Sequence, residues 1–143
     1  MKPTTEQKAI YEQTLRNLFA EADNFLNFLR EGNPLIKENG PVIMNKSSLV
    51  IAAYREQSMV GTVSDTLLEL DGEFNKENPD PRPALEDKIK TLEKELNDEL
   101  IALGIKDEDI EGITRHLAKI CKAASLAGIG DGLNYIISQA PAA

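Results

Sequence analysis

Four segments of the chain repeat apolar residues at alternating intervals of four and three, and this spacing constrains the fold more than any other feature. Such intervals place every member of a series on one side of an α-helix. Each series stops at glycine or proline after about three heptads, which favours a compact bundle within one chain over a long coiled coil. The first series is Tyr11, Leu15, Leu18, Ala22, Phe25 and Leu29.

The stop signals between the series set the expected helix boundaries. We predict long helices over residues 4–31, 47–70, 84–103 and 107–127, and a short last helix over 132–139. Thr4 followed by Gln7 is typical of a capping box, and Ser47 is interpreted as the N-cap of the second long helix.

Two glycine-containing segments are expected to interrupt the helices. Residues 32–46 are interpreted as a connection tucked onto the bundle, with one helical turn opening at Asn33 and Pro34 and a turn at 39–41. Residues 128–132, Gly-Ile-Gly-Asp-Gly, are expected to break the chain between the last two helices, with Asp131 capping the second of them.

The predicted fold is therefore all-α, a compact helical bundle of four main helices plus short accessory helical turns. Residues 1–143 are expected to form a single domain with hairpin-like halves at about 1–71 and 84–140. The halves are joined by the proline-rich linker 72–83, in which three prolines at alternate positions block a helix.

Charge and composition exclude several classes of function. The formal net charge of −8 disfavours nucleic acid as a partner, and no apolar stretch is long enough for a membrane span. The single cysteine, Cys121, excludes an intramolecular disulfide and is typical of the reducing cytoplasm, where we expect the protein to act.

No motif in the sequence predicts a metal, a cofactor or a catalytic pair. The acidic run at 107–112 begins like a calcium loop, but Ala118 stands where the twelfth-position acid belongs. His116 and Cys121, the single histidine and cysteine, are about 140° apart on a helix and cannot pair within it. Residues 128–132 lack the lysine of a phosphate-binding loop.

Glu56 stands where the second helix would carry an apolar residue. Either a bend near Gly61 keeps this carboxylate in water, or it points into the bundle. The second alternative leaves open a carboxylate-based enzyme with a cavity site near Glu56.

The favoured function is a non-enzymatic protein–protein interaction module, such as an adaptor, a chaperone-like protein or a regulatory subunit. A translocated virulence-type protein that acts on a host factor remains an alternative. Phe19, Leu26 and Phe28 widen the first apolar series and are the predicted surface for a protein partner or a homodimer. Arg115, Lys119 and Lys122 form a basic helix face, which is either simply solvated or a docking site for an acidic partner.

Overall fold

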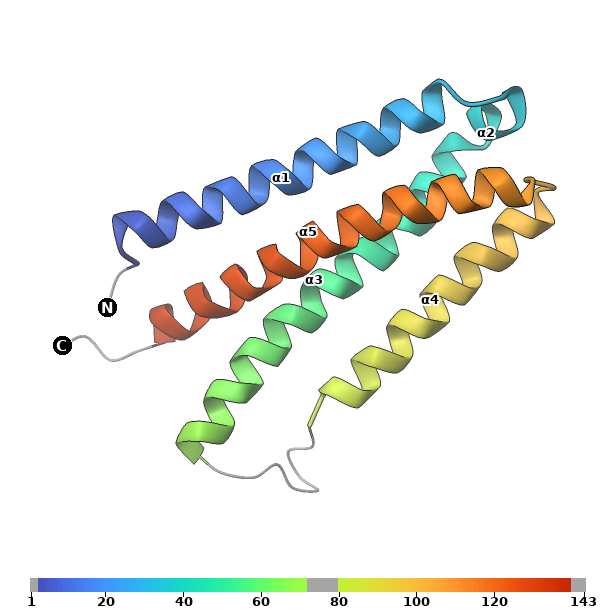
Figure 1. Cartoon of the computed structure of the whole chain (residues 1–143). Helices are drawn as coiled ribbons and strands as arrows, with labels where there is room; N and C mark the ends of the chain where they lie inside the picture. Colours follow the sequence, from blue (N-terminus) through green and yellow to red (C-terminus); the bar gives the residue numbers. More distant parts are fainter. Residues whose placement is uncertain (1–2, 72–79, 140–143) are drawn as a thin grey trace.

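The chain folds into a compact all-helical bundle, which confirms the predicted fold class (Figure 1). The structure is a computed structural model and describes residues 3–71 and 80–139, in which no strand occurs. Its elements are α1 (Thr5–Arg30), α2 (Pro34–Glu38), α3 (Gly40–Asp71), α4 (Arg82–Ala102) and α5 (Asp107–Gln139).

Helix α5 is the central element of the packing. It packs most extensively against α3 and next against α1, while α4 packs against α3. The largest contact thus joins α3 from the first predicted half to α5 from the second, and the two halves share one core. That core is mainly aliphatic and includes Phe25, Ile43, Leu100, Ile113 and Ile120.

The predicted signals at the start of the chain are confirmed. The Thr4 hydroxyl accepts a hydrogen bond from the backbone N–H of Gln7 at 3.1 Å, and the Gln7 side chain accepts from the Thr4 backbone N–H at 2.8 Å. The Asn33 side chain caps α2 by accepting from the backbone N–H of Ile36 at 3.1 Å, with Pro34 at the first helical position. Ile36 is buried, so this turn is tucked onto the bundle as expected.

The predicted start of the second long helix is wrong. Helix α3 begins at Gly40, so Val42–Met44 are helical and Ser47 lies fully buried inside the helix, where it is no N-cap. The physical reason is that Pro41 sits in the first turn, where its missing N–H costs nothing. The backbone N–H of Ile43 then bonds to the carbonyl oxygen of Asn39 at 3.0 Å.

The predicted break at residues 128–132 is also wrong, because α5 runs without interruption from Asp107 to Gln139. The glycines lie where another helix approaches closely. A Cβ on Gly132 would lie 2.9 Å from the carbonyl oxygen of Met59 and 2.8 Å from Cβ of Thr62, and one on Gly128 would overlap the carbonyl oxygen of Arg55. Their missing side chains let the backbones of α3 and α5 meet, and that packing overrides low helix propensity.

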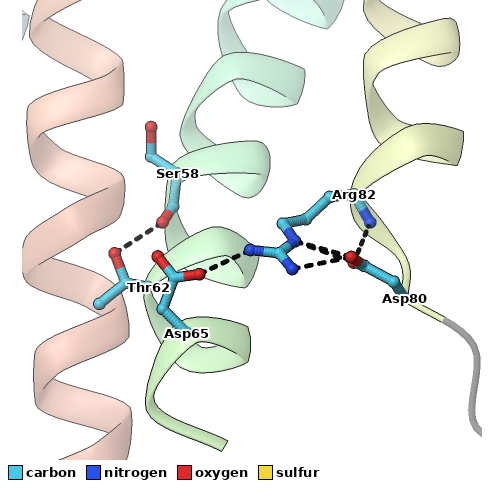
Figure 2. A network of polar contacts seen from close by, with 5 residues as sticks. All are labelled: Ser58, Thr62, Asp65, Asp80 and Arg82. Atoms are coloured by element: carbon cyan, nitrogen blue, oxygen red, sulfur yellow. Dashed lines mark hydrogen bonds and ion pairs between the residues drawn. The ribbon is translucent and has the colours of Figure 1, made fainter. Parts of the chain in front are cut away.

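Arg82 at the start of α4 ties this helix to α3 (Figure 2). Its guanidinium donates to Asp65 of α3 at 2.6 Å and to Asp80 at 2.8–3.0 Å. One turn before Asp65, the Thr62 hydroxyl donates to the carbonyl oxygen of Ser58 at 2.9 Å. Residues 72–79 of the predicted linker lie outside the described residues.

The close approach of α3 and α5 is tested by adding one methyl group. Gly128→Ala should lower the free energy of unfolding by about 1–3 kcal/mol, because the new Cβ overlaps backbone that cannot move independently. Gly61→Ala is the matched control, since a Cβ there meets no atom within 4 Å. It should raise the free energy of unfolding by about 0.5–1 kcal/mol through helix propensity. Equal stability of the two variants in urea titrations would contradict this packing.

Candidate functional site

An apolar groove runs between the N-terminal half of α1 and the C-terminal half of α5. Its volume is about 260 Å³. It is lined mainly by aliphatic side chains, together with the uncharged polar groups of Gln7, Thr14 and Asn134. The remaining lining residues are Ile10, Tyr11, Leu126, Ile129, Gly130, Leu133 and Ile137.

The groove keeps large apolar side chains in contact with water. Ile10 is 61% exposed, Leu126 53% and Leu133 49%. Single exposed aliphatic residues are common on soluble proteins, but a contiguous group around a hollow is typical of a binding surface. The groove is therefore the strongest candidate site in the described chain.

The continuity of α5 creates its side of the groove. One series on this helix faces the core: Ile113, Leu117, Ile120, Ala124 and Ala127 are all buried. A second series, Leu126, Ile129, Leu133 and Ile137, has helical intervals of three, four and four and lines the groove. A break at 128–132 would divide this second series, so the groove depends on the uninterrupted helix.

Tyr11, Arg55 and Asp131 form a polar cluster that joins α1, α3 and α5 beside the groove. Arg55 Nε donates to Asp131 Oδ2 at 2.6 Å, and Arg55 Nη2 donates to Oδ1 at 3.0 Å. The Tyr11 hydroxyl donates to Asp131 Oδ1 and accepts from Arg55 Nη2 at 3.3 Å. Such a two-point guanidinium–carboxylate contact is directional, so it fixes how the three helices lie relative to one another.

Electrostatics in this cluster follow from partial burial. The Asp131 side chain is 18% exposed and that of Arg55 is 34% exposed. The hydrogen bonds from Arg55 hold the pKa of Asp131 below its ordinary value, and Asp131 in turn raises the pKa of Arg55. The Tyr11 pKa is raised, first by its hydrogen bond to Asp131 and then by burial. At neutral pH the cluster is therefore an ion pair with a protonated tyrosine.

Asp131→Asn should lower the free energy of unfolding at pH 7 by about 1–2 kcal/mol, because Arg55 loses its charged partner. The lowered pKa of Asp131 means that its contribution is complete above the unfolded pKa near 4 and is lost as the pH falls through the folded pKa. The difference from wild type should thus shrink below about pH 4. Asp23→Asn, an exposed change on α1, should have little effect. A difference that stayed constant from pH 7 to the acid transition would contradict the ion pair.

The basic face predicted on the fourth long helix is exposed on α5. Arg115 pairs with Glu111 of the same helix at 3.1 Å. Lys119 and Lys122 form no ion pair within residues 3–71 and 80–139. Lys119 also lines a polar hollow on the α1–α5 seam, beyond the apolar groove.

The three predicted apolar partner-binding residues do not share one surface. Phe28 is half-buried against the His116 ring, with centroids 4.6 Å apart, and a Cβ on Gly112 would lie 2.8 Å from its Cζ. Leu26 is half-buried and lines a hollow formed with α2 and the start of α3. Phe19 is 62% exposed and lies outside the groove.

The Glu56 carboxylate lies on the surface of the bundle, in contact with water. It is exposed and pairs with Lys88 of α4 at 3.5 Å. The helix does not break here, because α3 continues to Asp71. Glu56 therefore does not point into an interior cavity.

Cys121 lies in the interior of the bundle, whereas His116 is half-buried and also lines the polar hollow that contains Lys119. The His116 ring stacks on Phe25 at a centroid distance of 6.1 Å, in addition to its contact with Phe28. Cys121 is buried, and burial together with the Glu93 charge raises the pKa of its thiol to about 12. A thiol in this state is a poor nucleophile at neutral pH.

The Cys121 thiol should accordingly resist modification in the native protein. With Ellman's reagent at pH 8, we expect labelling at least about 100-fold slower than in urea-unfolded protein, because the thiolate is scarce and shielded. A native rate close to the unfolded rate would show that Cys121 is accessible.

Where the structure describes the chain, no three His, Cys, Asp or Glu side chains are grouped so that they could hold a metal ion. Within those residues, no helix combines the length and the apolar character that crossing a membrane requires. The acidic start of α5 is helical, and Asp109 accepts a hydrogen bond from the Asn33 side chain at 2.8 Å.

The groove was not predicted from the sequence, although one signal was present. The intervals between Leu126, Ile129, Leu133 and Ile137 are helical once the glycines between them are allowed inside a helix.

Comparisons of the chain with protein-family models, with curated proteins and with solved structures gave no match. Function is therefore inferred from the groove and its surroundings.

Proposed function

We propose that this protein is a non-enzymatic interaction module whose α1/α5 groove binds a helix of another protein. The observation that carries the proposal is the group of exposed aliphatic side chains, Ile10, Leu126 and Leu133, around one hollow. A groove between two helices is the usual receptor for an amphipathic helix, which supplies apolar residues at intervals of three and four. The groove would shield those residues and its own side chains from water together.

Other features favour binding over catalysis. Cys121, the side chain most suited to nucleophilic chemistry, is buried, and the His116 ring packs on the Phe25 and Phe28 rings outside the groove. The groove itself is lined by aliphatic and uncharged polar groups, with the Tyr11 ring as its one titratable side chain. The raised pKa of Tyr11 keeps it protonated at neutral pH. We place the module in the cytoplasm, where its single cysteine would stay reduced.

The proposal is tested by affinity capture from the cells that produce the protein, with two matched variants. Ile10→Glu places a carboxylate in the groove, and partner binding should fall by at least about tenfold because the charge would be buried on docking. Leu49→Glu makes the same change at an equally exposed aliphatic residue, 55% against 61% exposed, on α3 and outside the groove.

A partner that binds wild type and Leu49→Glu but not Ile10→Glu supports the proposal. Equal capture by all three proteins would contradict it, as would loss of every partner with Leu49→Glu alone. Light scattering on the same proteins identifies a homodimer. Self-association that Ile10→Glu abolishes would make a second copy of the chain the occupant of the groove.

A further inference from the structure

The solvent face of α5 changes character along its length. With about 100° of rotation per residue, the basic residues and the four aliphatic groove residues of α5 fall within about 80° of one another. The face is basic over Arg115, Lys119 and Lys122 and apolar over Leu126, Ile129 and Leu133. The two halves meet at Lys122 and Leu126, which are one helical turn apart. The basic face and the groove are thus one continuous surface.

The charge on this surface opposes that of the whole chain. The protein carries a formal net charge of −8, yet Lys119 and Lys122 are exposed and form no ion pair within the described residues. Glu21 and Glu31 of α1 line the polar hollow together with Lys119. A negatively charged ligand is therefore attracted on the α5 side of the seam and repelled on the α1 side, which favours a ligand that follows α5.

We propose, on the basis of the interaction function proposed above, that the occupant is an amphipathic helix whose apolar residues fill the groove and whose one end is acidic. The distance along α5 from Lys119 to Ile137 is about 27 Å, which an 18-residue helix spans. The aliphatic side chains of this helix contact Ile10, Leu126 and Leu133. Its Asp or Glu residues lie against Lys119 and Lys122.

The concave shape and the overall charge favour this occupant over an anionic membrane surface. The apolar side chains come from two helices and line a hollow, into which a protruding helix face fits better than a flat lipid surface. An anionic bilayer is also much wider than the two lysines and would face the acidic remainder of a protein with a net charge of −8, whereas the acidic end of a helix meets Lys119 and Lys122 locally.

The test selects a displayed library of 18-residue helix-forming peptides against the full-length protein. The library carries fixed aliphatic residues at intervals of three and four and random charged or neutral residues elsewhere. Selected peptides should concentrate Asp and Glu at one end. The double variant Lys119→Glu and Lys122→Glu should bind these peptides about tenfold more weakly than wild type at low salt. The difference in affinity should be smaller at high salt, because salt screens the charges.

A matched double variant separates the local charge from the net charge. Lys90→Glu and Lys94→Glu on α4 change the net charge equally at two exposed lysines, so its binding should stay within about twofold of wild type. Equal weakening by both double variants, or selected peptides without an acidic end, would overturn the acidic-helix proposal.

The same peptides distinguish failure of this inference from failure of the proposed function. If Ile10→Glu abolishes peptide binding but the double variant Lys119→Glu and Lys122→Glu does not weaken it, the groove is the binding site and the proposed preference for an acidic ligand is wrong. If no peptide is enriched, or if selected peptides bind Ile10→Glu as tightly as wild type, the groove proposal fails as well. Sedimentation with phosphatidylcholine–phosphatidylglycerol vesicles gives the last outcome. If the protein binds vesicles through Lys119 and Lys122 but binds no peptide, the proposal of a helical ligand is wrong and the surface binds a membrane instead.

Discussion

The close approach of α3 and α5 is the contact on which the rest of the structure depends. Gly128 and Gly132 present no side chain to α3, and the carbonyl oxygens of Arg55 and Met59 occupy the space that their Cβ atoms would take. Glycine costs about 1 kcal/mol in helix propensity relative to alanine. The packing of two long backbones against each other offsets this cost, and α5 stays helical through its glycine-rich segment. Gly130, on another side of the helix, meets the Tyr11 ring of α1 instead.

Two consequences of this contact reach the surface. The first is the Arg55–Asp131 ion pair, which requires α3 and α5 to be adjacent and which recruits the Tyr11 hydroxyl from α1. The second is the groove, since an uninterrupted α5 carries its second apolar series alongside α1. The glycines that were predicted to break the helix thus allow α5 to continue, and the candidate binding surface depends on that continuity. The basic residues on the preceding turns of α5 extend that surface, so that one end is basic and the other is apolar.

The sequence predicted those features that depend on local chemistry. The capping box at Thr4, the turn at Asn33 and Pro34, and the end of the third long helix near Gly104, which has a φ of +79°, are all set by residues close in the chain. On α1, α4 and α5 the buried apolar series follow from periodicity alone. Features that depend on neighbours far along the chain were not predictable in this way. Gly128 could not be assigned to a helix without knowing that α3 lies against it, and Asp131 is 76 positions from its partner Arg55. Lys119 and Lys122 were identified as a basic face, but their continuity with Leu126 requires the helix to continue.

The central claim is that α5 passes through residues 128–132 as one helix and so builds the groove with α1. Amide hydrogen exchange followed by NMR tests it residue by residue. If the claim holds, the amides from Leu126 to Leu133 exchange slowly and as one protected block, because each is bonded within a helix packed on α3. Fast exchange confined to residues 128–132, with protection on both sides, would show a broken helix and contradict the account.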